Sequence, residues 1–311
     1  MRLLVLGAGG IGGYFGGRLV EAGADVTFLV RPGRAAQLAR DGLVVRSPAG
    51  DIERAVRSIG VGQLASDGRY DAVLLTCKAY DLEAAIAAVA PAVSQGAVVI
   101  PMLNGMRHLD RLDLAFGRTA VLGGLCQIAA TLAPSGEVRH LNTLHTLILG
   151  PRAASQEGVA GAFVQAASGA RFDCRASGDI AQDMWEKFVM LATMAAMTCL
   201  MRATVGEIMQ AEDGAALMNE ALDECDLVAH AAGHRGRPAF LERARALLTE
   251  RGSNFAASML RDIERGGPTE GAHVVGDMLA RARAAGLAAP LLRVAWCHLQ
   301  AHAARQEAER A

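Results

Sequence analysis

Near its start the chain reads Leu3-Leu4-Val5-Leu6-Gly7-Ala8-Gly9-Gly10-Ile11-Gly12, and this stretch indicates the fold of the first half of the sequence. The four apolar residues predict a short buried strand, and a G-x-G-x-x-G motif follows directly. Gly7 permits a tight turn, Gly9 leaves space for a pyrophosphate, and Gly12 lets a helix approach the strand closely. The helix N-terminus adds free N–H groups and a positive dipole end. We therefore expect a dinucleotide site rather than a merely structural glycine turn, formed by Gly7, Ala8, Gly9, Gly10, Ile11 and Gly12.

Outward from this loop, the first half of the chain alternates short apolar runs with helical stretches. Short apolar runs bounded by turn signals are typical of buried parallel strands. The predicted strands are Leu3–Leu6, Asp25–Val30, Ala72–Cys77 and Ala97–Ile100. The predicted helices between them are Ile11–Ala22, Arg34–Asp41 and Leu82–Val89. This alternation predicts an α/β fold with a Rossmann-type, doubly wound sheet.

The pattern changes twice after the fourth predicted strand. The segment from Thr119 to Gly150 is rich in β-forming residues around the turn Pro134-Ser135-Gly136, which predicts antiparallel strands that extend the sheet. From Asp179, a candidate N-cap, helical periodicity continues almost to the end. Its breaks lie near Gly233–Pro238, Gly252–Asn254, Gly266–Pro268 and Gly286–Pro290. We expect the Rossmann domain over residues 1–176 and an all-α C-terminal domain over residues 177–311.

Composition excludes several classes of function. The net charge is −1 and the basic residues do not cluster, which argues against a nucleic-acid partner. The longest apolar stretch, Phe188–Met201, is interrupted by two threonines and is shorter than the roughly 20 residues that span a bilayer, so a buried helix is expected and no membrane partner. The histidines are dispersed and the six cysteines lack paired spacing, which predicts no metal site and free thiols. With no signal-peptide pattern after Met1, we expect a cytoplasmic protein.

The end of the second predicted strand indicates which dinucleotide binds. NAD sites usually carry an acidic residue here, which holds the ribose 2′-hydroxyl. This chain instead reads Arg31-Pro32-Gly33-Arg34 after Val30. A guanidinium at Arg31 can pair with the 2′-phosphate of NADP, so NADPH is the expected cofactor. The alternative is that Arg31 and Arg34 are a solvated helix start.

Three polar side chains occupy positions suited to chemistry. Lys78 follows the strand predicted over Ala72–Cys77, and Asn104 follows the next one, so both are expected at the carboxyl edge of the sheet, where ligands of such folds bind. Lys187 lies on the first helix of the C-terminal domain. Each has a structural alternative, because most lysines are solvated and Asn-Gly is usually only a turn.

Taken together, these segments resemble the ketopantoate reductase (2-dehydropantoate 2-reductase) family over essentially the whole chain. The matching motifs are the glycine loop, Cys77-Lys78-Ala79, Asn104-Gly105-Met106, Trp185-Glu186-Lys187, Ala257-Ser258-Met259-Leu260-Arg261-Asp262 and Pro268-Thr269-Glu270. The resemblance implies NADPH-dependent reduction of a 2-oxo acid, most directly 2-dehydropantoate to pantoate in pantothenate biosynthesis.

The resemblance also implies roles for individual residues. Lys187 would be the general acid that protonates the ketone oxygen, which suits an ammonium that stabilises a developing alkoxide. Glu270 would orient the substrate hydroxyl or the catalytic ammonium, and would lie at the cofactor. Asn104 and Lys78 would position substrate and nicotinamide ribose, and Ser258 would contact the substrate carboxylate. Glu270 could instead be an acid favoured by a helix N-terminus, and Ser258 could be purely structural.

The sequence departs from the family where amides are expected to face the substrate. Leu191, Ala195 and Val275 stand where pantoate-forming members carry Asn. Losing such contacts could cost roughly 1–3 kcal/mol each if polar atoms of the substrate stay unpaired. The alternatives are therefore a paralogous reductase for a more apolar 2-oxo acid and a non-catalytic NADPH-binding protein. The apolar helices of the second domain are also compatible with a homodimer.

Overall fold

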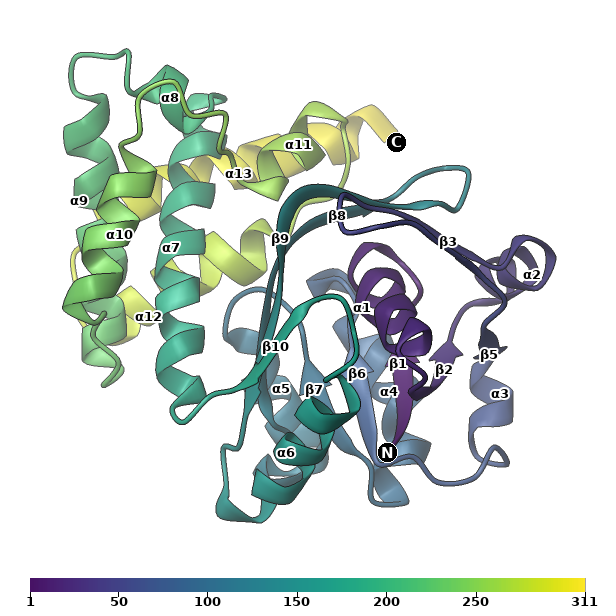
Figure 1. The fold of residues 1–311 in the computed structure, drawn as a ribbon. Coiled ribbons are helices and arrows are strands. Elements are labelled where there is room, and N and C mark those ends of the chain that lie inside the picture. Colours follow the sequence, from purple (N-terminus) through teal and green to yellow (C-terminus); the bar gives the residue numbers. More distant parts are fainter. Residues whose placement is uncertain (311) are drawn as a thin grey trace. The chain divides into compact units, whose positions relative to one another are not determined.

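The computed structural model describes residues 1–310, and the chain folds into two compact units (Figure 1). The first unit comprises Met1–Leu103 and His108–Ile180. The second comprises Asn104–Arg107 and the chain from Ala181 onward. The first unit is α/β with a parallel sheet and the second is helical, so the predicted fold class is confirmed.

A five-stranded parallel sheet forms the centre of the first unit, in the order β5-β2-β1-β6-β7. Its strands are β1 (Arg2–Leu6), β2 (Asp25–Leu29), β5 (Arg57–Ile59), β6 (Ala72–Leu75) and β7 (Val98–Pro101). Four of them match the predicted strands. The run over Ala72–Cys77 ends its pairing at Leu75, so Cys77 already belongs to the loop. The apolar side chains of β1 and β6 are almost wholly buried, because helices cover both faces of a parallel sheet.

The chain adds β2 and β5 on one side of β1 and then crosses back to add β6 and β7 on the other side. Right-handed crossovers then place α1 (Gly10–Glu21) and α4 (Leu82–Ser94) on opposite faces, as Figure 1 shows. The remaining helices of the unit are α2 (Pro32–Asp41), α3 (Val61–Leu64), α5 (Arg107–Phe116) and α6 (Glu157–Ala166), with 3₁₀ turns η1 (Ala79–Asp81), η2 (Arg118–Ala120) and η3 (Ala154–Gln156). The gap between β1 and β6 is a topological switch point, where such folds bind ligands.

A second sheet covers the outer face of α1, and one sequence prediction is wrong here. The strands β8 (Gly123–Leu132) and β9 (Val138–Gly150) form the expected antiparallel pair, but they do not extend the parallel sheet. Strand β9 pairs instead with β10 (Asp173–Ala176) and β3 (Leu43–Arg46), and β3 pairs in turn with β4 (Ile52–Arg54). Among the described residues, one isolated β-bridge, between Val99 of β7 and Val121 just before β8, links the start of β8 to the parallel sheet. Figure 1 shows β8, β9 and β3 arching over α1.

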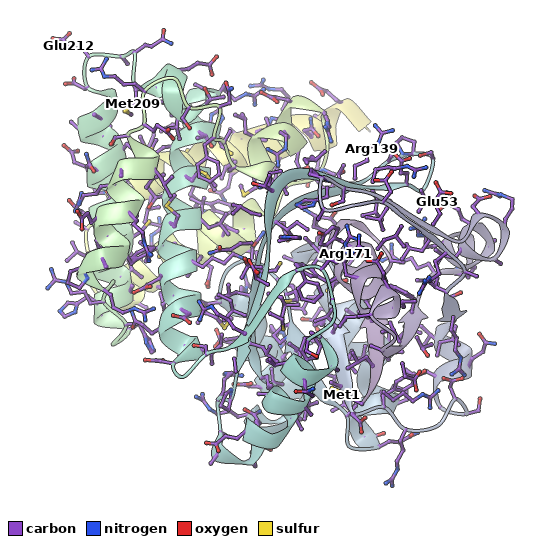
Figure 2. All side chains as sticks on the ribbon, in the orientation of Figure 1. Met1, Glu53, Arg139, Arg171, Met209 and Glu212 are labelled. Carbon is purple, nitrogen blue, oxygen red and sulfur yellow. The ribbon has the colours of Figure 1, made fainter. Side chains whose placement is uncertain are left out.

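Small residues let α1 lie between the two sheets. A side chain at Gly16 would meet Phe28 of the parallel sheet, and one at Gly13 would meet Val138 of β9. Polar contacts hold the same helix to the second sheet, since the Tyr14 hydroxyl lies 2.7 Å from Nδ1 of His145. Charged side chains are exposed on that sheet, and Figure 2 labels Glu53 and Arg139 among them. The second sheet therefore buries the face of α1 that the parallel sheet leaves open.

The second unit is built from helices. They are α7 (Ile180–Met201), α8 (Val205–Ile208), α9 (Gly214–Ala231), α10 (Pro238–Leu248), α11 (Ser258–Glu264), α12 (Asp277–Ala284) and α13 (Pro290–Arg310), with a π-helical segment η4 (Ala272–Gly276). The four predicted breaks all fall between these helices. Helix α7 starts directly after Asp179, the residue predicted to cap it.

Helix α7 is the one candidate membrane span among the described residues by length and composition. Most of its apolar window is buried inside the protein. Phe188, Val189 and Cys199 are almost inaccessible to solvent. The helix is therefore a core element of the second unit, as the sequence predicts.

Candidate active site

The register of the parallel sheet aligns the carboxyl ends of four strands in one row. Leu6 of β1 pairs with Leu29 of β2 and with Leu75 of β6, and Leu75 pairs with Pro101 of β7. The segments that follow these residues therefore leave the sheet side by side. They carry Arg31, the glycine loop and Lys78, so three of the predicted elements of the cofactor site lie at one edge of the first unit.

The glycine loop has the backbone that a pyrophosphate requires. Gly7 has a positive φ of 92°, and its N–H donates to Leu29 O at 2.9 Å, which fixes the turn. Gly9 is the N-cap of α1 and has no heavy atom within 4 Å of the position a Cβ would take. Space therefore remains above Gly9 for a phosphate to approach the backbone. Ala8 is buried beneath the loop, while Gly10 and Ile11 open the helix whose N-terminus faces that space.

Gly12 shows why a side chain is excluded from the base of the loop. A Cβ at this position would collide with Gly7 O and with Oγ1 of Thr76. The Thr76 hydroxyl itself donates to Leu6 O at 2.7 Å and so links β6 to the end of β1. Thr76 is a positioning residue that the sequence analysis missed. Its only signal is its place directly after the strand.

Arg31 is placed at the surface, directly after β2, where it is the N-cap of α2. Its Nη2 atom lies 2.8 Å from Oδ1 of Asp81, and 78% of its side chain is exposed. Asp81 ends η1, the short turn that follows Lys78, and its N–H donates to Lys78 O at 3.0 Å. Asp81 was not singled out from the sequence, because the two partners are 50 positions apart.

Arg34 is not the solvated residue that the alternative interpretation supposes. Its Nε donates to Ala8 O at 3.0 Å, and its Nη1 donates to Gly136 O at 2.8 Å and to Gln37. Burial lowers the pKa of Arg34 from its ordinary value. The guanidinium therefore ties the glycine loop to the turn between β8 and β9, a structural task next to the cofactor loop.

Lysine is rare in this chain, and both lysines fall at the predicted site positions. Of 31 basic residues only Lys78 and Lys187 are lysines; the rest are arginines. Lys78 is exposed and lies at the start of η1, at the carboxyl edge of the sheet. An ammonium can give up its proton near neutral pH when its surroundings allow, whereas a guanidinium cannot. The two positions that carry lysine are therefore candidates for chemistry that arginine does not perform.

In the second unit, Lys187 lies in the third turn of α7 and is half-buried. The helix carries apolar residues around it. Leu191 follows one turn later and is half-buried, and Ala195 comes one turn after that and is fully buried. The spacing of four residues puts all three on one face of α7. This face of α7 therefore carries the Lys187 ammonium, followed by the apolar side chains of Leu191 and Ala195.

A second group of site residues meets around His273. A Cβ at Gly105 would lie 2.9 Å from His273 O and 3.2 Å from its ring, so the loop that carries Asn104 packs directly against His273. Glu270 is buried, and its carbonyl oxygen accepts the N–H groups of His273 and Val274. The structure thus brings Glu270, His273 and the Asn104 loop together within the second unit.

Burial lowers the pKa of the His273 imidazole, while Glu270 and Asp277 oppose that shift. A neutral imidazole donates a hydrogen bond through one ring nitrogen and accepts one through the other. Val275 follows on the same π-helical segment and is completely buried. Ser258 is the first residue of α11 and is half-buried.

A glycine loop on a parallel sheet, followed by an all-helical unit that carries a lysine and a buried glutamate, defines the class of Rossmann-type oxidoreductases with a helical C-terminal domain. Comparison with known families narrows this class. The family described as "Ketopantoate reductase PanE/ApbA" matches residues 3–154, and its C-terminal counterpart matches residues 179–303. The chain belongs to the ketopantoate reductase family, which confirms the resemblance found in the sequence.

Individual relatives cover nearly the whole chain. An uncharacterized oxidoreductase, YkpB of Bacillus subtilis, is 38% identical over 306 residues, covering 98% of this chain and 100% of its own. The 2-dehydropantoate 2-reductase of Halobacterium salinarum is 28% identical over 295 residues, covering 94% and 96% of the two chains. These relatives support an oxidoreductase of the ketopantoate reductase type and leave its substrate open.

Solved structures show the same fold. A D-mandelate dehydrogenase, solved with NADH and anilino(oxo)acetate, has a TM-score of 0.87 at 18% identity and covers 99% of both chains. A ketopantoate reductase from Staphylococcus aureus, described as dimeric, has a TM-score of 0.81 at 19% identity and covers 98% of this chain and 100% of its own. At these identities the likeness establishes the fold alone.

Proposed function

We propose that this protein reduces a 2-oxo acid to the corresponding 2-hydroxy acid with NADPH, and that Lys187 is the general acid. The observation that carries the proposal is the occurrence of lysine at two positions only, Lys78 and Lys187, in a chain whose other Lys or Arg positions are all arginine. Both positions fall in the motifs that match the ketopantoate reductase family. Membership of the family indicates the type of reaction, and the two lysines provide the ammonium groups that this reaction needs.

The cofactor fits the first unit. The open space above Gly9, the positive φ of Gly7 and the N-terminus of α1 form a cradle for a pyrophosphate. Arg31 offers a guanidinium for a 2′-phosphate, and Lys78 offers an ammonium at the same edge for the nicotinamide ribose. When bound, NADPH supplies the hydride for the carbonyl carbon.

The chain's own residues handle the proton and the orientation of the substrate. Lys187 Nζ donates a hydrogen bond to the ketone oxygen, stabilises the negative charge that develops there and then transfers its proton. The Glu270 carboxylate accepts a hydrogen bond from the Lys187 ammonium or from a substrate hydroxyl and so fixes its direction. Asn104 contributes an amide to the substrate, and Ser258 donates its hydroxyl proton to the substrate carboxylate.

The first candidate substrate is 2-dehydropantoate, which would make the product pantoate and place the enzyme in pantothenate biosynthesis. A second candidate is a more apolar 2-oxo acid. The hydrocarbon at Leu191, Ala195 and Val275 favours this second candidate, because a hydroxylated substrate leaves its polar atoms unpaired there. The D-mandelate dehydrogenase that shares this fold is also consistent with the more apolar substrate.

The deciding experiment is NADPH oxidation by the purified protein with 2-dehydropantoate beside a panel of apolar 2-oxo acids. Saturable turnover of 2-dehydropantoate at the highest kcat/KM of the panel supports the first candidate. A higher kcat/KM with an unhydroxylated acid supports the second. If none of the acids is reduced although NADPH binds, the oxidoreductase assignment to 2-oxo acids is wrong.

We also propose that the protein is a cytoplasmic homodimer. The dimeric reductase from Staphylococcus aureus is one support. Another is the pair of neighbouring helices α9 and α13, on which Leu227 and Val294 are 51% and 54% exposed. Such side chains gain about 25 cal/mol for each Å² that they bury. Light scattering should give twice the chain mass for the wild type and a monomer for Val294→Glu.

A further inference from the structure

The ion pair between Arg31 and Asp81 joins the two segments that flank the glycine loop. Arg31 follows β2 and Asp81 follows β6, while the glycine loop follows β1, which lies between these two strands in the sheet. The Nη2–Oδ1 distance is 2.8 Å. The pair therefore lies at the edge of the sheet along which a dinucleotide extends away from its pyrophosphate.

The position after β2 decides between the two nicotinamide cofactors in Rossmann folds. An acid there accepts a hydrogen bond from the ribose 2′-hydroxyl of NADH, and an arginine there pairs with the 2′-phosphate of NADPH. This chain carries both an arginine and an acid at this place, because Arg31 follows β2 and Asp81 of η1 forms an ion pair with it. The 2′-phosphate would thus meet a guanidinium that already has a carboxylate partner.

We propose that Asp81 sets the cofactor selectivity by competing with the 2′-phosphate for Arg31, so that the protein accepts NADH as well as NADPH. The carboxylate lowers the affinity for NADPH because it occupies the guanidinium that would otherwise pair with the phosphate. In the complex with NADH, the same carboxylate accepts a hydrogen bond from the 2′-hydroxyl. This inference rests on the cofactor site of the proposed function but not on its substrate.

The size of the effect follows from the exposure of the pair. The Arg31 side chain is 78% exposed and that of Asp81 is 36% exposed, so solvent screens their attraction. Exposed pairs contribute at most about 1 kcal/mol, which corresponds to roughly a fivefold change in an equilibrium constant. The competition is therefore modest, and a phosphate that carries up to two negative charges can displace the carboxylate. The selectivity should also depend on salt.

The test measures dissociation constants of NADPH and NADH without substrate, from the fluorescence of the reduced nicotinamide. We expect Asp81→Asn to tighten NADPH binding about fivefold, to leave NADH binding unchanged or slightly weaker, and to raise the preference for NADPH accordingly. In an Arg31→Ala background the gain for NADPH should disappear. An unchanged ratio in Asp81→Asn, or a gain that persists without Arg31, overturns the proposal.

A matched control is available on the neighbouring helix. Glu83 of α4 forms an exposed ion pair with Arg111, with an Nε–Oε1 distance of 2.8 Å, so Glu83→Gln removes one negative charge from a pair of the same kind. The Glu83→Gln variant should keep the wild-type ratio. If it shifts the ratio as much as Asp81→Asn does, the cause is the general field of the protein and the proposal is wrong. Because binding is measured alone, failure of 2-oxo acid turnover leaves this test intact.

Discussion

Gly105 and His273 lie in direct contact, and the contact leaves no room for a side chain on the glycine. A Cβ would come within 2.9 Å of His273 O, and the φ of Gly105 is +82°. This relationship joins the loop that carries Asn104 to the π-helical segment after Glu270. The geometry of the candidate substrate site therefore depends on Gly105, a residue without a side chain that could react or bind.

Gly105→Ala should therefore lower both stability and turnover. An alanine with positive φ costs about 1–2 kcal/mol, and the contact with His273 adds to this. Displacement of the Asn104 loop should lower kcat on the order of 10- to 100-fold. Urea unfolding and steady-state kinetics measure the two effects. The control is Gly62→Ala, since no heavy atom lies within 4 Å of a Cβ there; equal losses in both variants would contradict the explanation.

Lys187→Ala should lower turnover by about 10²- to 10⁴-fold, because the general acid is lost, while NADPH binds with nearly unchanged affinity. Lys187→Arg keeps the charge but not a transferable proton, so it should stay slow. Reductive methylation with an isotope label offers a second readout, since only two lysine signals exist beside that of the N-terminus. The Lys187 signal should shift on addition of a 2-oxo acid. Wild-type turnover in Lys187→Ala would refute the assignment.

Arg31→Ala should weaken NADPH binding much more than NADH binding. A charge-assisted hydrogen bond to a phosphate is worth about 1.5–3 kcal/mol, so the loss for NADPH should be on the order of tenfold or more. NADH lacks the 2′-phosphate and offers this guanidinium only a neutral 2′-hydroxyl. Calorimetry with both cofactors checks the difference. Equal losses would show that Arg31 supports the loop rather than the 2′-phosphate.

Leu191→Asn should move substrate preference toward 2-dehydropantoate. An amide one turn after Lys187 can pair with a substrate hydroxyl, which is worth roughly 1–3 kcal/mol where that hydroxyl is otherwise unsatisfied. The ratio of kcat/KM for 2-dehydropantoate to that for an unhydroxylated 2-oxo acid should rise at least fivefold, by the same estimate. Leu200→Asn, another half-buried leucine of α7, should leave this ratio unchanged. No rise in Leu191→Asn would mean that this face of the helix does not touch the substrate.

His273 should make folding sensitive to mild acid. Its pKa is lowered from 6.5 by burial, so below pH 6.5 the unfolded chain takes up a proton that the folded protein resists. The free energy of unfolding should therefore fall as the pH drops through 6.5, until the lowered pKa of the folded state is reached. Urea unfolding at several pH values should show a smaller decrease for His273→Gln than for the wild type. Parallel pH profiles for the two proteins would contradict this.

The sequence predicted the strands that carry the cofactor loop, because buried parallel strands combine an apolar run with flanking turn residues. It placed β8 and β9 in the wrong sheet, since the period of a strand does not identify its partner. Strands such as β4 (Ile52–Arg54) are too short and too charged to be recognised. The pair of Arg31 with Asp81 and the contact of Gly105 with His273 join residues far apart in the chain, so only the structure shows them. The number of lysines, in contrast, is plain from the sequence.

The position of α1 between two sheets has a consequence for cooperativity. Gly12, Gly13, Gly16 and Gly17 each weaken an isolated helix by about 1 kcal/mol relative to alanine, so α1 depends on both sheets for its stability. If the second sheet opens, the helix loses the packing that offsets its glycines, and the phosphate cradle is lost with it. Amide hydrogens of α1 should then exchange only with the cooperative unfolding of the whole first unit, and bound NADPH should slow the exchange of both sheets together.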